Sequence, residues 1–70
     1  DLVNAAQFYA EAIALDPALA QAHRGLGLSL MKIGQPGPGQ AALRRYLALA
    51  PDAADARLIG MMIPSEGTTP

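Results

Sequence analysis

Apolar residues recur every three or four positions along three stretches of the chain, and this spacing predicts three amphipathic helices. The marker positions are Ala6, Tyr9, Ala10 and Ile13 in the first stretch, Ala22, Leu26, Leu30 and Ile33 in the second, and Leu43, Tyr46, Leu47 and Ala50 in the third. A weaker pattern over residues 52–63, with Leu58, Met61 and Met62, predicts a fourth helix. The expected fold class is therefore all-α.

Proline, glycine and aspartate mark the boundaries of these predicted helices. Pro17 and Pro51 close the first and third helices, because the residue before a proline is pushed out of the helical region. Gly34 closes the second, since glycine adopts a positive φ at a helix end at low cost. Asp52 is expected to cap the fourth helix, with Asp55 in its first turn near the positive end of the helix dipole.

The chain also repeats itself. The segment IALDPALAQA, residues 13–22, aligns with LALAPDAADA, residues 47–56, at an offset of 34 residues with five of ten positions identical. A pair of helices that repeats every 34 residues and ends in L-x-P resembles the tetratricopeptide repeat. In this resemblance, 18–51 is one complete repeat, 1–17 is the second helix of a preceding repeat, and 52–63 is a terminal or capping helix.

Short motifs carry the resemblance. AHRGLGLSLMKIGQ, residues 22–35, is similar to the family's first helix, with Leu26 and Gly27 as its Leu-Gly pair, and residues 41–51 are similar to its second helix. Two features depart from the family pattern. His23 stands where the family often has a bulky aromatic residue, and no Leu-Gly pair follows residue 51. The resemblance implies antiparallel helix pairs of an α-solenoid, with about four helices in roughly two repeats.

The stretch GQPGPGQ, residues 34–40, is compatible with a flexible linker, a phosphate-binding loop or a tight turn. It lacks the Lys-Ser/Thr of a P-loop and follows a predicted helix rather than a strand. The 34-residue interval matches the repeat length of the family, which leaves no room for an inserted linker. We therefore predict a stiff turn in which Pro36 or Pro38 starts the next helix and Gly39 lies where the two helices approach.

Composition narrows the function classes. A net charge of −1 provides no steering field for nucleic acid or an anionic membrane, and no apolar run of about 18 residues is present to span a membrane. The chain has no cysteine, so disulfides cannot stabilise its 70 residues, and no compartment is indicated. Residues 64–70 are predicted to be a disordered tail, and we interpret a chain that starts at Asp1 as the C-terminal piece of a longer protein.

Candidate catalytic and metal-binding residues are few. His23 is the sole histidine, and without a second histidine or a cysteine it is expected to be structural. Ser29 is six residues away, on a nearly opposite helix face, so the two form no catalytic pair. Gly25 and Gly27 begin a G-x-G-x-x-G pattern that Leu30 breaks, and we expect them to mark helix crossings. We predict no enzyme activity, no cofactor and no metal site.

The resemblance implies a binding surface instead, because first helices line the concave groove of such arrays. The expected groove residues, which would bind a protein or peptide partner, are Gln21, Arg24, Leu28, Met31 and Lys32. They predict an apolar groove with a basic rim, and a carboxylate clamp is not expected, since Leu28 replaces the usual asparagine. The alternatives are packing against a neighbouring repeat, self-association as a homo-oligomer, capping of a longer array, or an accessory C-terminal domain of a larger enzyme.

Overall fold

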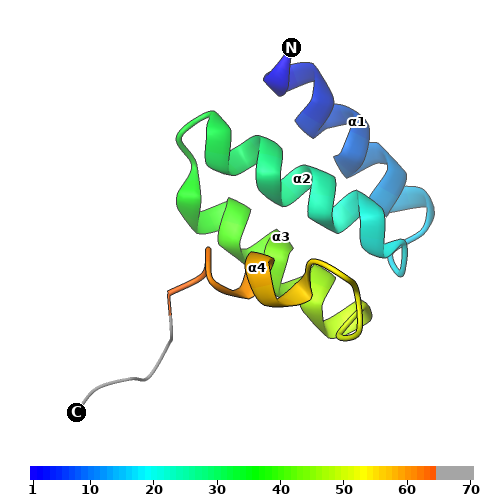
Figure 1. Ribbon diagram of the computed structural model, residues 1–70. Helices are drawn as coiled ribbons and strands as arrows, with labels where there is room; N and C mark the ends of the chain where they lie inside the picture. Colours follow the sequence, from blue (N-terminus) through cyan, green and yellow to red (C-terminus); the bar gives the residue numbers. More distant parts are fainter. Residues whose placement is uncertain (65–70) are drawn as a thin grey trace.

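The computed structural model describes residues 1–64, and this range contains four helices: α1 (Leu2–Leu15), α2 (Ala20–Lys32), α3 (Pro36–Leu49) and α4 (Ala56–Gly60). The first three run antiparallel, one after another, and α4 lies beside α3 (Figure 1). The predicted all-α class is confirmed. The predicted tail lies outside the described residues except for Pro64, which is exposed and outside any helix.

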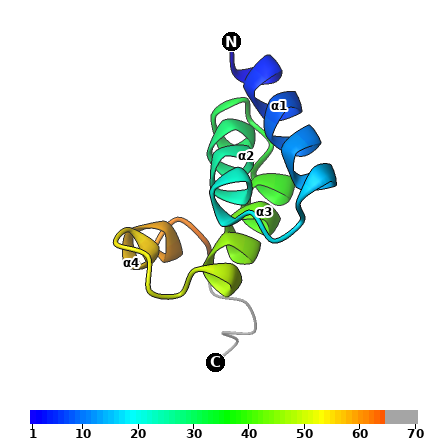
Figure 2. The ribbon, with the colours of Figure 1, turned by 90° about the vertical axis from the view of Figure 1, so that its right-hand side faces the viewer.

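Each helix packs against its neighbours in the chain. Among the described residues, the backbone of α1 lies close to that of α2, α2 to α3 and α3 to α4, and no other pair of helices has backbones this close. Figure 2 shows α1 and α4 on opposite sides of the central α2–α3 pair. Close approach of helix backbones is thus restricted to helices that are consecutive in the chain.

The 34-residue repetition of the sequence is also present in the backbone. Helices α1 and α3 both have 14 residues, and both ends of α3 lie 34 positions after those of α1. The turn that follows each helix begins in the same way: the N–H of Asp16 donates to the carbonyl of Ala12 over 2.9 Å, and that of Ala50 to the carbonyl of Tyr46 over 2.8 Å. The length of α1 and the start of the turn after it are therefore repeated in α3 and the turn after it.

The predicted helix boundaries and the predicted turn are confirmed for α1 to α3. Each of α1 and α3 ends two residues before a proline, Pro17 and Pro51 respectively. Gly34 has a φ of 84° and follows the end of α2. Pro36 is the first residue of α3, where its missing N–H would have no partner within the helix. The Gly/Pro stretch thus contains the end of a short inter-helix turn, Gly34 and Gln35, followed by the first turn of α3.

Glycines allow the three long helices to approach closely, as predicted. A Cβ atom at Gly25 would overlap the ring of Tyr9 on α1. A Cβ atom at Gly27 would lie 2.6 Å from the side chain of Leu43 on α3 and 2.9 Å from the carbonyl oxygen of Gly39. The two faces of α2 that carry these glycines are therefore closed by α1 and α3.

The fourth helix is shorter than the predicted range 52–63, and Asp52 does not cap it. Residues 51–55 form two consecutive turns, closed by hydrogen bonds from the N–H of Ala53 to the carbonyl of Ala50 and from the N–H of Ala56 to the carbonyl of Ala53. These turns occupy the positions that the apolar pattern assigned to helix. Asp55 precedes the helix, but its carboxylate does not cap the backbone because side chains of α2 and α3 bind it.

The core lies where α2, α3 and α4 meet. Leu43 and Tyr46 of α3 and Ile59 of α4 are at most 2% exposed. Leu28 and Met31 of α2 pack against this cluster from the other side. The short α4 therefore covers one end of the core instead of extending the stack by a full helix.

Candidate partner-binding surface

The five residues predicted to face a groove lie along one side of α2, which we call the α2 strip: Gln21, Arg24, Leu28, Met31 and Lys32. Their spacing of mostly three or four residues places them on one helix face. Gly25, which faces α1, and Gly27, which faces α3, flank this face. The strip thus lies between the two faces of α2 that carry these glycines.

The strip is not uniformly exposed. Gln21 and Lys32 are exposed, while Leu28 and Met31 are half-buried and contribute to the core beneath them. The Met31 thioether reaches the backbone of α3, since a Cβ atom at Gly39 would lie 3.0 Å from its sulfur. This contact with α3 lies within the predicted repeat 18–51, so the alternative in which the strip packs against a neighbouring repeat stays a prediction.

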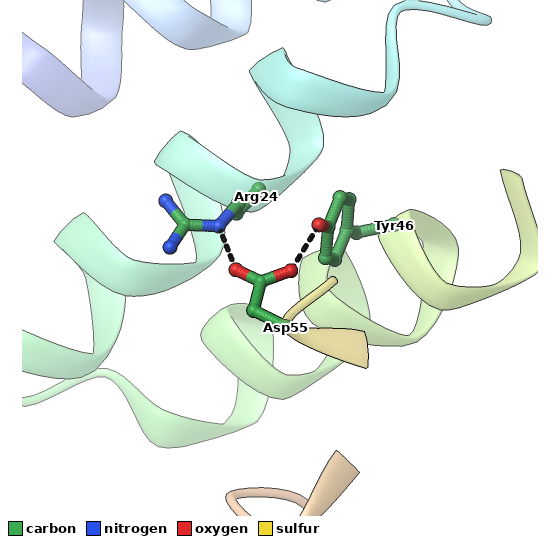
Figure 3. A network of polar contacts seen from close by, with 3 residues as sticks. All are labelled: Arg24, Tyr46 and Asp55. Atoms are coloured by element: carbon green, nitrogen blue, oxygen red, sulfur yellow. Dashed lines mark hydrogen bonds and ion pairs between the residues drawn. The ribbon is translucent and has the colours of Figure 1, made fainter. Parts of the chain in front are cut away.

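Arg24 takes part in a polar network that joins three elements (Figure 3). Its Nε donates a hydrogen bond of 2.6 Å to Oδ2 of Asp55, and the Tyr46 hydroxyl donates to Oδ1 of the same carboxylate. Arg24 comes from α2, Tyr46 from α3, and Asp55 from the residue just before α4. One carboxylate therefore ties the start of α4 to both helices of the central pair.

The network fixes the charge of its members. The hydrogen bonds from Tyr46 and then Arg24 lower the pKa of Asp55 below its usual value. The bond to Asp55 raises the pKa of the Tyr46 hydroxyl, and burial adds to this shift. The same carboxylate raises the pKa of Arg24. At neutral pH an anionic Asp55 therefore lies between a cationic Arg24 and a neutral tyrosine. Arg24 is engaged inside the chain, and Lys32 is the strip's exposed cation.

Asp55 is the residue that the local patterns missed. They assigned it to the helix dipole, whereas its contacts are 31 and 9 residues away in the chain. The repeat alignment contained the signal, because the offset of 34 pairs Asp55 with Gln21, a residue of the α2 strip. In the structure Asp55 lies in the turn before α4, where its carboxylate reaches Arg24.

The two residues considered for catalysis, His23 and Ser29, are both buried within the helical packing of α2. His23 is buried, and its Nε2 lies 2.8 Å from the carbonyl oxygen of Pro17, a partner that ties α2 to the preceding turn. Ser29 is also buried in α2. Within residues 1–64 no group of His, Asp and Glu is placed to hold a metal ion, no pocket is present, and every helix is too short or too polar to cross a membrane.

Comparisons with protein-family models, with curated proteins and with solved structures find no match to this chain.

Proposed function

We propose that this chain is a protein-interaction module whose helices stack as in tetratricopeptide arrays, and that it binds a peptide or protein segment along the α2 strip. One observation carries the proposal: α2 meets α1 and α3 through the faces that carry Gly25 and Gly27, and the face between them keeps exposed or half-buried side chains. That face carries apolar side chains, Leu28 and Met31, between the polar residues Gln21 and Lys32. An apolar centre with a polar rim is the usual composition of a protein-binding surface.

The strip favours a partner that is apolar with an acidic group at one end. A segment lying along α2 would cover the accessible parts of Leu28 and Met31, and this burial supplies most of the affinity. Lys32, in the last turn of α2, would attract a carboxylate of the partner. An exposed pair of this kind contributes about 0–1 kcal/mol, so it selects register and orientation more than it adds affinity.

Selection of a random peptide library on the chain, followed by NMR shift mapping with a selected peptide, tests this proposal. We expect the amide signals of Gln21, Leu28 and Lys32 to move most. Lys32→Glu should weaken binding of acidic peptides up to about fivefold. The matched control is Arg45→Glu, which reverses an exposed charge on α3 and should leave the affinity unchanged. Selected peptides that shift only α1 or the outer face of α3 would contradict the proposal.

A further inference from the structure

The Asp55 carboxylate is bound by two donors that belong to the central helix pair (Figure 3). Nε of Arg24 donates to Oδ2 over 2.6 Å, and the Tyr46 hydroxyl donates to Oδ1. Each oxygen of the carboxylate therefore has its own donor, and one of the two donors is positively charged. A charged and a neutral donor that meet the two oxygens of one carboxylate are the elements of a binding site for that group.

The packing of α2 on α3 positions the two donors. Tyr46 is 1% exposed and belongs to the core cluster, together with Leu43 on the same helix. Arg24 lies on α2 within one turn of Gly27, where α2 and α3 approach closely. The two donors are therefore parts of the central pair, and the segment that contains α4 contributes neither of them.

The carboxylate comes from a short segment. Asp55 follows two consecutive turns and precedes α4, which has five residues, and Ile59 is its buried residue. The side chains of Arg24 and Asp55 are 37% and 26% exposed, so solvent reaches their ion pair. Ion pairs that solvent reaches are weak. This one can therefore open at the surface while Ile59 still holds α4 in the core.

The site lies on the α2 strip. Arg24 is a member of the strip, with Gln21 about one turn before it and Leu28 about one turn after it. The site differs from the carboxylate clamp considered for the repeat family, because its second donor is a tyrosine of α3 and not an asparagine of α2. With Asp55 bound, this end of the strip presents an ion pair without net charge, whereas Lys32 at the other end is an exposed cation.

We propose that Arg24 and Tyr46 form a carboxylate-binding site, and that Asp55 fills it as an internal ligand that closes this end of the α2 strip to the acidic group of a partner. A partner carboxylate, from a side chain or a chain terminus, competes with Asp55 for the accessible guanidinium, and Asp55 keeps the buried Tyr46 hydroxyl. The site itself is independent of the proposed function, and the competition with a partner rests on it.

Chemical rescue by acetate tests the site without any partner. Asp55→Gly removes a CH2–carboxylate group, and acetate supplies the same group with one more hydrogen. Asp55→Gly should melt below the original chain, and acetate should raise its melting temperature more than chloride at equal ionic strength does. Acetate at about ten times its dissociation constant raises the folding equilibrium constant about elevenfold. An Asp55→Gly chain that is unfolded in chloride should refold in acetate.

Two matched variants control the rescue. Asp55→Ala keeps the Cβ atom, which would overlap the methyl group of acetate, so acetate should stabilise it less than Asp55→Gly, and formate should stabilise it at least as well as acetate. Asp52→Gly removes an exposed carboxylate from the same pair of turns, and neither anion should stabilise it more than chloride does. Adding Tyr46→Phe to Asp55→Gly should weaken the rescue, because one of the two donors is lost.

Peptide binding tests the internal competition. Peptides selected from the random library on Asp55→Ala should bind that variant up to about fivefold more tightly than the original chain, because its Arg24 has no internal carboxylate. Asp52→Ala changes the net charge equally and should bind these peptides as the original chain does. Amidation of the C-terminus or of the acidic side chains shows which carboxylate binds, since only that change removes the difference.

The outcomes separate the two proposals. Acetate that stabilises Asp55→Gly and Asp52→Gly equally, or neither of them, overturns the carboxylate site. Rescue by acetate together with equal peptide binding by Asp55→Ala and the original chain overturns the internal competition. Rescue by acetate without peptide binding at the α2 strip overturns the proposed function, and with it the competition, but supports the carboxylate site.

Discussion

The close crossing of α2 and α3 makes a sharp prediction for Gly27→Ala. Alanine is favoured over glycine in a helix interior by about 1 kcal/mol, so local preference alone predicts a more stable protein. The new Cβ atom, however, would lie 2.6 Å from Leu43 and 2.9 Å from the carbonyl oxygen of Gly39. Carbon atoms in good contact are about 3.5–4.0 Å apart, so the two helices must separate by roughly 1 Å.

The magnitude follows from which atoms can move. Leu43 is fully buried, and the Gly39 oxygen belongs to the backbone of α3, so neither can swing aside. Overpacking of a rigid core costs about 1–3 kcal/mol, and a clash with backbone belongs near the upper end of that range. After the helix preference is subtracted, we expect Gly27→Ala to destabilise the fold by about 2 kcal/mol. In a domain of this size that lowers the melting temperature by about 8–16 °C.

Thermal unfolding followed by circular dichroism, at one fixed low protein concentration, measures this effect. The matched control is Gly60→Ala, the same chemical change in α4, where the new Cβ atom would meet Leu47 at an ordinary 3.8 Å. The control should melt at the original temperature or above it. A Gly27→Ala protein that melts at or above the original temperature would refute the close crossing that we describe.

Three further predictions concern the turn and the polar network. Gly34→Ala should destabilise the fold by about 1 kcal/mol in urea unfolding, because the φ of 84° strains any residue with a Cβ atom; unchanged stability would contradict the positive φ. Tyr46→Phe should raise the pKa of Asp55 towards its usual value in a carboxyl ¹³C NMR titration, because it removes the first cause of the lowered pKa. Stability should fall as the pH drops below 3.8, the ordinary pKa of Asp55, because the pKa of Asp55 is lower in the folded state than in the unfolded state. Stability should also fall as the pH rises above 10.0, the ordinary pKa of Tyr46, because the pKa of Tyr46 is higher in the folded state. Urea unfolding as a function of pH measures both limbs, and an acid limb as steep in Asp55→Asn as in the original chain would contradict the assignment.

The three long helices were predictable because their signals are local. A 3.6-residue apolar period, a proline two residues after each of α1 and α3, and a glycine with positive φ after α2 act within a few residues of the backbone that they shape. The close approach at Gly25 and Gly27 was predictable for a related reason, since glycine in a helix interior costs stability that a helix crossing can repay.

The extent of α4 and the role of Asp55 were not predictable from local patterns. The hydrogen bonds of the turns after Pro51 repeat those after Pro17, yet α4 begins at Ala56, two residues after the position equivalent to the start of α2. Asp55 follows a turn, where an acidic residue ordinarily caps a helix. Here the Arg24 guanidinium and the Tyr46 hydroxyl bind the Asp55 carboxylate instead of the backbone of α4. They lie 31 and 9 residues away from Asp55 in the chain.

Arg24 connects the α2 strip to the start of α4. As a member of the α2 strip it was expected to supply a basic rim, yet its Nε binds the carboxylate that also holds the start of α4. The same ion pair therefore reduces the positive charge offered to a peptide and fixes the segment that carries Met61. A partner carboxylate that replaced Asp55 on Arg24 would have to leave Asp55 with Tyr46 alone and would loosen α4 from α3. A peptide carboxylate at the Arg24 end of the strip thus competes with the contact that holds the start of α4, whereas binding at the Lys32 end leaves that contact intact.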